Sequence, residues 1–198
     1  MSNLDLGNNE FINYEFHENS EKPTIVFSNS LGSDLNMWNP QVEFFKNDYQ
    51  LVLYDKRGHG KSSPIQGPYN FDMLENDVIS IMDELNITTA HFIGLSMGGM
   101  TSLGLALKYP HRFNKMVCCA ARADMPPPAI ESWDQRMAVV EEKGTEGVVQ
   151  GSIERWFSDE FRNDSSNSDI INKAGEMIKS TSVQGYIGSC NAIKGLDY

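Results

Sequence analysis

The 198-residue chain is long enough for one domain with a substantial apolar core, and its composition, 40% hydrophobic and 22% charged, is typical of a globular protein. Its formal net charge of −11 argues against binding to nucleic acids or anionic membranes, because both require a basic face. The N-terminus lacks the pattern of a signal peptide, and no apolar run approaches the length of a membrane span. These features predict a cytoplasmic protein of undetermined oligomeric state.

Short apolar segments alternate with helical patterns over the first 120 residues. Polar and apolar residues alternate around Tyr14, which predicts a half-buried antiparallel strand at the beginning of the sheet. Nearly continuous apolar runs predict parallel strands covered on both faces, at 24–28, 51–55, 90–94 and 115–120. Apolar residues at helical spacing predict helices from Trp38 to Phe45 and from Leu74 to Leu85. This alternation predicts an α/β fold with a doubly wound, mostly parallel sheet.

The pattern changes after Met125, where three consecutive prolines follow that cannot occupy a central strand. From that point apolar residues recur at helical spacing, and glycines separate the segments. We therefore divide the chain into an N-terminal α/β core, residues 1–124, and a helical cap or lid, residues 125–198. The alternative is a helical C-terminal domain without a lid function.

The stretch Gly94-Leu95-Ser96-Met97-Gly98 lies between an apolar run and a helical pattern that continues to Pro110. It matches the G-x-S-x-G pattern, in which a serine occupies a strained turn from strand to helix. Side chains two residues before or after the serine would collide with the neighbouring strand or the new helix, so glycines stand there. The pattern predicts Ser96 as a catalytic nucleophile. The alternative is a glycine-rich turn with an idle hydroxyl.

Acyl transfer from a serine requires two backbone N–H groups that stabilise the negative oxygen of the tetrahedral intermediate. One is expected from Met97, which follows the nucleophile, and the other from Leu31, in the loop after the predicted strand 24–28. The alternative for Asn29 and Ser30 is a turn held by its own side chains, which is compatible with this role.

The loop Tyr54-Asp-Lys-Arg-Gly-His-Gly60 contains an aspartate and a histidine. We interpret it as structural: its glycines permit a tight turn, Arg57 is expected to pair with Asp55, and His59 is expected to bond to neighbouring backbone. The alternative is a direct chemical role for Asp55 or His59.

A serine nucleophile needs a histidine base oriented by a carboxylate, in the chain order serine, acid, histidine. His111 is the one histidine that follows Ser96, and we expect it at the opposite edge of the sheet. The histidines before the serine are also rejected as bases; they are His17, His59 and His91.

No metal-ligand spacing and no phosphate-binding glycine loop is found, so we expect a site without metal or cofactor. The adjacent Cys118 and Cys119 lie in an apolar run and are expected to be buried, reduced thiols.

Three segments together resemble the α/β-hydrolase superfamily: Ser28-Asn-Ser-Leu-Gly32 with Met37-Trp38, the Arg57-Gly-His-Gly60 loop, and Gly94-Leu-Ser-Met-Gly-Gly-Met100. The segments 28–38, 154–157 and 185–193 further resemble the 3-oxoadipate enol-lactonases of aromatic catabolism by the β-ketoadipate route. The resemblance covers nearly the whole chain. It implies hydrolysis of the lactone ester bond of 3-oxoadipate enol-lactone to 3-oxoadipate through an acyl-enzyme on Ser96.

Members of this family continue beyond the cap into strands that carry the acid and the histidine. The resemblance therefore implies that the C-terminal core strands are absent from this chain and that the 198 residues alone are inactive. The rival functions are those of another carboxylesterase or perhydrolase of the same fold, and of a non-catalytic remnant or binding protein.

The implied substrate, a small lactone, carries a carboxylate, for which an acidic protein needs a local cation. Arg136 and Arg155 are the candidates, with solvated helix arginines as the alternative. Trp133, on the same predicted helix as Arg136, is a candidate to cover the lactone ring, and ordinary packing is its alternative.

Overall fold

The structure is a computed structural model that describes residues 2–198. Its strands form a six-stranded sheet in the order β1-β2-β4-β3-β5-β6. The strands are β1 (Ser2–Gly7), β2 (Glu10–His17), β3 (Thr24–Ser28), β4 (Gln50–Tyr54), β5 (Ala90–Leu95) and β6 (Phe113–Cys119). The α-helices are α1 (Asn39–Phe45), α2 (Phe71–Glu84), α3 (Met97–Lys108), α4 (Pro127–Lys143), α5 (Val149–Trp156), α6 (Asp159–Asn163), α7 (Ser168–Ser180) and α8 (Val183–Lys194). Short 3-10 helices are η1 (Leu35–Trp38), η2 (Pro110–Arg112), η3 (Thr145–Val148) and η4 (Ser165–Asn167).

The predicted mostly parallel α/β sheet is confirmed. β4, β3, β5 and β6 pair in parallel, whereas β2 pairs antiparallel with both β1 and β4. The prediction missed β1, which makes β2 an internal strand of the sheet instead of its beginning. Within β1 a single residue, Leu4, is buried, so the segment carries too few apolar residues to show the alternation of a half-buried strand.

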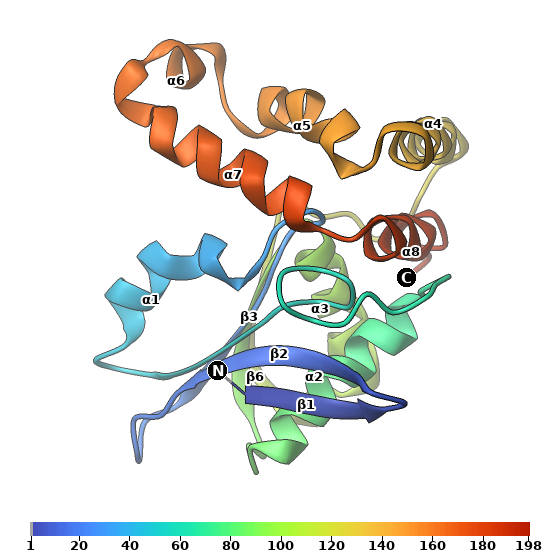
Figure 1. The fold of residues 1–198 in the computed structure, drawn as a ribbon. Coiled ribbons are helices and arrows are strands. Elements are labelled where there is room, and N and C mark those ends of the chain that lie inside the picture. The colour runs from blue at the N-terminus through green and yellow to red at the C-terminus, as the bar shows by residue number, and fades with distance from the viewer. Residues whose placement is uncertain (1) are drawn as a thin grey trace.

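Side chains on the central strands alternate between two apolar layers, as a sheet covered on both faces requires. Ile25 and Phe27 of β3 pack in the cluster that includes Val42 of α1. Val26, between them, packs in the cluster that includes Val78 of α2. Because successive residues of one strand enter opposite layers, helices cover both sides of the sheet, with α1 on one side and α2 and α3 on the other (Figure 1).

The strand order reverses between β3 and β5, which are neighbours in the sheet although β4 lies between them in the sequence. Their register pairs Ser28 with Gly94, so the two strands end side by side. In open α/β sheets ligands bind outside the carboxyl ends of the strands at such a reversal. The loop after β3 and the turn after β5 therefore start at the place where this architecture favours a site.

The last third of the chain is helical, as predicted. α4 begins at Pro127 and Pro128, whose fixed φ suits the first turn of a helix. Figure 1 shows α4, α5, α6 and α7 as a layer above the sheet, with α8 returning beside the core. The division of the chain at residues 124 and 125 remains a prediction, although β6 is the last strand and α4 the first element after it.

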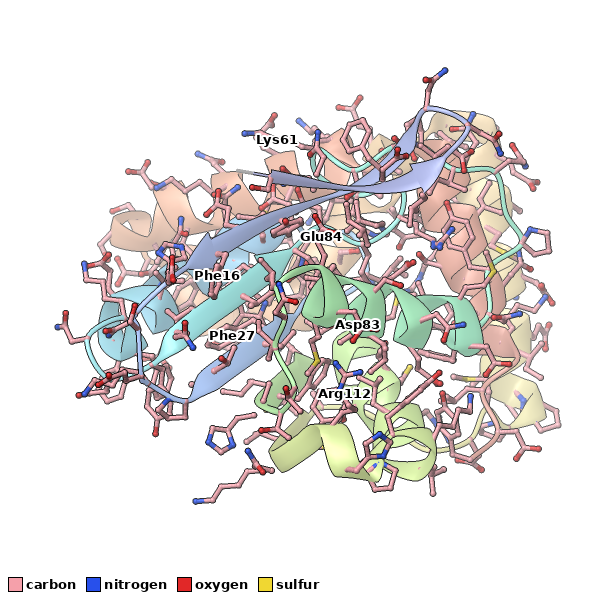
Figure 2. All side chains as sticks on the ribbon, turned by 90° about the horizontal axis from the view of Figure 1, so that it is seen from below. Phe16, Phe27, Lys61, Asp83, Glu84 and Arg112 are labelled. Atoms are coloured by element: carbon pink, nitrogen blue, oxygen red, sulfur yellow. The ribbon has the colours of Figure 1, made fainter. Side chains whose placement is uncertain are left out.

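Arg112, which follows His111 in η2, connects this short helix to α2 and to the segment before β5. Its Nη2 lies 2.7 Å from Oδ1 of Asp83, and its Nε donates to the Thr88 carbonyl at 2.9 Å. Arg112 and Asp83 are labelled in Figure 2, which views the molecule from below. Since η2 leads into the start of β6, which is parallel to β5, His111 lies at the edge of the sheet opposite to the carboxyl ends of β3 and β5, as predicted.

The cysteines differ from the prediction. Cys118 is exposed and Cys119 is partly exposed, whereas Cys190 of α8 is buried. The reason is that β6 is an edge strand, and most of its residues are exposed or only half-buried. In the part of the chain that the structure describes, none of the helices combines the length and apolarity that crossing a membrane requires.

Candidate active site

Ser96 occupies the turn between β5 and α3 in a strained conformation. Its φ of 54° and ψ of −113° lie outside the regions that non-glycine residues ordinarily adopt. The turn is held because the Ser96 N–H donates to the Cys119 carbonyl at 2.8 Å and the Ser96 carbonyl accepts from the Met100 N–H at 2.9 Å. The chain therefore has the geometry of a nucleophile elbow, with a half-buried serine at its apex.

The two glycines of the motif are required by close backbone contacts. A Cβ on Gly94 would lie 2.1 Å from the Gly98 carbonyl oxygen, and one on Gly98 would lie 2.1 Å from the Ser28 carbonyl oxygen. Any larger residue at either position would push α3 away from β5 or from β3. The glycines thus allow the helix to begin directly against the ends of both strands.

The predicted oxyanion donors, Leu31 and Met97, lie on the two segments that meet at the elbow. The Gly98 N–H donates to the Asn29 carbonyl at 3.1 Å and so joins the elbow to the loop after β3. Within residues 2–198, the Leu31 and Met97 N–H groups donate to no protein atom. Met97 is also the first residue of α3, where N–H groups lack intrahelical partners and the helix dipole favours negative charge.

The loop after β3 is fixed by side chains, as the alternative interpretation of Asn29 and Ser30 expected. Asn29 is fully buried; its Nδ2 donates to the Tyr54 carbonyl at 3.0 Å, and its Oδ1 accepts from Nε1 of Trp38 at 2.8 Å. Ser33 Oγ donates to the Ser30 carbonyl at 2.9 Å. These bonds hold the loop without involving the Leu31 N–H, so the two interpretations of the loop are compatible.

A cleft of about 1400 Å³ opens in front of Ser96. The loop after β3 and the start of α1 form one side, and α5 and α7 form the other, consistent with the position of α7 above α1 in Figure 1. The side opposite the serine carries apolar residues together with charged ones; the apolar ones include Trp156, Ile170 and Met177, and the charged ones include Asp169, Lys173 and Glu176. The cleft thus has Ser96 on its sheet side and both apolar and charged side chains on the side of α5 and α7.

The predicted substrate residues divide into two groups. Arg155 lines the cleft together with Ser96, whereas Trp133 and Arg136 are not among the residues that line it. Instead the Arg136 guanidinium lies over the Trp133 ring, 4.2 Å from its centroid. Arg155 Nη2 donates to Ser152 Oγ at 2.9 Å. Burial, followed by the positive charge of Arg136, lowers the pKa of Arg155, so the two guanidinium groups are close enough to repel each other.

Tyr186, which the sequence interpretation did not single out, connects this arginine pair to the loop after β3. A Cβ on Gly32 would lie 3.4 Å from Cε2 of Tyr186, so the ring covers the backbone next to Leu31. Burial raises the pKa of Tyr186 to about 12, against the opposing charges of Arg136 and Arg155. Among residues 2–198 neither arginine forms an ion pair with a carboxylate. Acidic side chains are nevertheless nearby, because Asp34, Asp169 and Glu176 line the cleft and the negative charge of Glu154 opposes the lowering of the Arg155 pKa.

The loop Asp55–Gly60 corrects one prediction and confirms another. Arg57 pairs with Asp77 of α2 instead of Asp55, through Nε and Nη2 at 2.6 Å each. The Asp55 carboxylate instead accepts from the N–H groups of Leu35 and Lys61. His59 bonds to neighbouring backbone as predicted, with Nδ1 2.9 Å from the Arg57 carbonyl. Sequence spacing could not reveal the Asp77 pairing, because α2 approaches the loop only in the folded chain.

In residues 2–198 no histidine is hydrogen-bonded to the Ser96 hydroxyl. His59 is fully buried with both ring nitrogens in contact with backbone. His91 stands at the start of β5, about 16 Å of extended strand from Ser96. The described residues also contain no group of three or more histidine, cysteine, aspartate or glutamate side chains that could hold a metal ion.

Comparison with known proteins agrees with this geometry. Residues 23–185 match a family model described as alpha/beta hydrolase fold. The chain is 37% identical over 186 residues to 3-oxoadipate enol-lactonase 2 of Acinetobacter baylyi, covering 94% of this chain and 68% of that protein. It is 40% identical over 175 residues to 3-oxoadipate enol-lactonase 1 of the same organism, covering 88% of this chain and 64% of that protein. The chain thus spans about two thirds of these curated relatives.

Among solved structures, the enol-lactonase from Burkholderia xenovorans LB400 superposes with a TM-score of 0.89 at 33% identity, covering 96% of this chain and 72% of that chain. The match includes both the sheet with its serine turn and the helices that follow it. The chain therefore belongs to the α/β-hydrolase fold family.

Proposed function

We propose that this protein hydrolyses the lactone ester bond of 3-oxoadipate enol-lactone to 3-oxoadipate, with Ser96 as the nucleophile. The observation that carries the proposal is the strained turn at Ser96, which opens onto a cleft beside two unused backbone N–H groups. The names of the two Acinetobacter relatives support this substrate among the esters that such a site could hydrolyse. The product would place the protein in the β-ketoadipate route of aromatic catabolism.

In the proposed reaction the Ser96 oxygen attacks the lactone carbonyl while its proton passes to a base. The N–H groups of Leu31 and Met97 bind the oxygen that becomes negative. Collapse of the tetrahedral intermediate breaks the ring C–O bond, and the ring oxygen leaves as an enolate that takes up the proton. The opened chain stays attached to Ser96 until water, deprotonated by the same base, attacks the acyl carbonyl and releases the acid.

The base itself is the missing part of the described site. A serine is activated by an adjacent histidine, and no histidine of residues 2–198 bonds to Ser96. We therefore propose that the histidine and its carboxylate are supplied from outside these residues. On this proposal residues 1–198 alone do not turn over substrate.

Arg155 is the better of the two candidates for the substrate carboxylate, because it lines the same cleft as Ser96. Arg136 does not line the cleft, but its charge adds to that of Arg155 while its guanidinium remains stacked on Trp133. Trp133 is then a support for Arg136 instead of a cover for the lactone ring. On this proposal the C-terminal helices serve as a cap that provides the cation, while the core provides the serine.

The first experiment tests whether the serine is activated. The protein at its natural length should hydrolyse the enol-lactone and bind a fluorophosphonate probe covalently, and Ser96→Ala should lose both. Ser189→Ala is a matched control, because its buried hydroxyl has no hydrogen-bond partner among the described residues and its loss should leave both activities intact. Probe labelling that persists in Ser96→Ala would contradict the proposal.

A substrate panel then separates the rival functions. The panel contains the enol-lactone, its carboxylate methyl ester and a simple aryl ester, and perhydrolysis is assayed with hydrogen peroxide. Preference for the carboxylate-bearing lactone supports the enol-lactonase, and preference for the aryl ester or for perhydrolysis identifies another hydrolase. Absence of turnover on every substrate, together with absence of labelling, would favour a non-catalytic binding protein.

A further inference from the structure

Lys56 is a buried lysine that lies directly beneath the loop after β3. Its side chain is only 1% exposed, and its ammonium group donates to the Asn29 carbonyl at 2.7 Å and to the Ser30 carbonyl at 3.1 Å. The neighbouring Asp55 carboxylate is engaged elsewhere, with Asn13 and two backbone N–H groups. Burial lowers the pKa of Lys56 to about 7, while the negative charge of Asp55 opposes this effect. Burying this cation therefore costs free energy that its hydrogen bonds must offset.

The two carbonyl groups do not need the lysine to satisfy them. The Asn29 carbonyl also accepts from the Gly98 N–H at 3.1 Å, and the Ser30 carbonyl also accepts from Ser33 Oγ at 2.9 Å. An apolar side chain at position 56 would leave each oxygen with one donor, which suffices for a buried carbonyl. The ammonium group is thus redundant for hydrogen bonding, although it is costly to bury.

The position of the ammonium group matters because the Ser30 carbonyl and the Leu31 N–H belong to one peptide unit. This unit is trans, so its carbonyl and N–H point in opposite directions. A cation that draws the Ser30 oxygen inward turns the Leu31 N–H outward. The same cation withdraws electron density from the peptide and so strengthens its N–H as a donor.

His59 fixes the next peptide unit in the complementary sense. Its Nε2 accepts from the Gly32 N–H at 3.1 Å, and its Nδ1 lies 2.9 Å from the Arg57 carbonyl. This pattern requires the neutral ring with the proton on Nδ1, because Nε2 must remain an acceptor. Burial, followed by the charge of Lys56, lowers the pKa of His59 to about 3, which keeps the ring neutral. The Gly32 N–H is therefore occupied, whereas the Leu31 N–H donates to no protein atom among residues 2–198.

We propose that Lys56 is a positioning residue that directs the Leu31 N–H toward the oxyanion and polarises this N–H through the Ser30 carbonyl of the same peptide unit. The inference rests on the proposed function, since it requires Leu31 to be an oxyanion donor. A lysine used only for packing would not affect the transition state more than the ground state. A positioning role predicts the opposite, because an oxyanion exists only after the nucleophile attacks.

The test compares Lys56→Met with the unchanged protein at its natural length. We expect kcat to fall roughly 10- to 100-fold with KM nearly unchanged, somewhat less than the loss of a whole oxyanion donor. The affinity for a boronic acid, which forms an anionic tetrahedral adduct on the serine, should fall by a similar factor, whereas the affinity for the product should not. Lys108→Met is the control, because this half-exposed lysine pairs with Glu75 of α2, and its kcat should be unchanged.

Several results would overturn the inference while leaving the proposed function intact. If Ser96→Ala is inactive but Lys56→Met keeps its kcat and boronate affinity, Lys56 does not position the donor. A raised KM at constant kcat would show a ground-state role, with the same conclusion. If Ser96→Ala retains turnover, the proposed function fails instead.

A measurement on the unsubstituted protein covers the case in which Lys56→Met does not fold. With ¹³C at the lysine ε-carbons, one lysine signal should titrate near 7. Formation of the boronate adduct should shift this titration to higher pH, because negative charge nearby favours the ammonium form. A titration unchanged by the adduct would overturn the inference.

Discussion

Gly98→Ala separates helix propensity from the packing of the elbow. Gly98 lies in the first turn of α3, where alanine is ordinarily the more stable residue by about 0.8–1 kcal/mol. At this position, however, the added Cβ would lie 2.1 Å from the Ser28 carbonyl oxygen and 2.5 Å from its carbonyl carbon. Both contacts are with the backbone of β3, which is held between β4 and β5 and cannot give way as a flexible side chain would.

The start of α3 must therefore move by roughly the radius of an atom, which weakens the 3.1 Å bond from the Gly98 N–H to the Asn29 carbonyl. Overpacking and this lost bond together predict that the free energy of unfolding falls by about 2–4 kcal/mol. The same movement displaces Ser96 relative to Leu31, so kcat should fall as well. Urea unfolding and steady-state kinetics measure the two effects.

Gly175→Ala is the matched control. Gly175 lies inside α7, and an added Cβ would meet its nearest atom, Cγ1 of Val149, at an ordinary 3.5 Å. Alanine at this position should raise the free energy of unfolding by about 0.5–1 kcal/mol. If the two variants proved equally stable, the contact with Ser28 would not explain the glycine of the motif.

The remaining predictions concern charge. Because burial lowers the pKa of His59 from 6.5 to about 3, the unfolded chain binds a proton there that the folded chain does not, so stability should fall by about 1.4 kcal/mol per pH unit from 6.5 toward 3. Urea titrations at several pH values should show a shallower slope in His59→Gln, and an unchanged slope would contradict the assignment. Asp77→Asn leaves the Arg57 guanidinium without its buried partner and should lower the free energy of unfolding, measured by urea titration, by about 3–5 kcal/mol. A loss below about 1 kcal/mol would refute the importance of the pair. Arg155→Met should raise KM for the carboxylate-bearing lactone about 10- to 100-fold but leave KM for its methyl ester unchanged. Arg162→Met removes the pair with an exposed aspartate of α6 and should change KM for neither substrate. If Arg155→Met raised KM equally for the lactone and its methyl ester, a contact between Arg155 and the carboxylate would be excluded.

The central parallel strands β3 and β4 were predictable because they are buried on both faces and therefore read as short apolar runs. β3 begins and ends at the predicted residues, and β4 and β5 lie within one residue of the prediction at each end. β1 was not predicted, because it pairs with one neighbour only and most of its side chains face solvent. Exposure also explains the error at Cys118, since an apolar run on an edge strand need not be covered.

The site was predictable where its geometry is local. The glycines around Ser96 have a steric reason that can be stated from the motif itself, and the contacts at Gly94 and Gly98 supply that reason. The charged contacts could not be predicted, because they join segments distant in the sequence. Lys56 stands among charged residues that favour an exposed loop, yet the loop folds under β3 and buries it.

The loop that contains Lys56 and His59 also supports the C-terminal helices. The Gly58 carbonyl accepts from the N–H and the hydroxyl of Ser182, and a Cβ on Gly185 would lie 2.5 Å from the Gly58 Cα. One rigid segment thus contacts the start of α8 on one side and the peptide beside Leu31 on the other. A displacement of the start of α8 would therefore be transmitted through Gly58 and His59 to the peptide beside Leu31. On the proposed mechanism, a larger residue at Gly185 should therefore lower kcat although it touches no reacting atom.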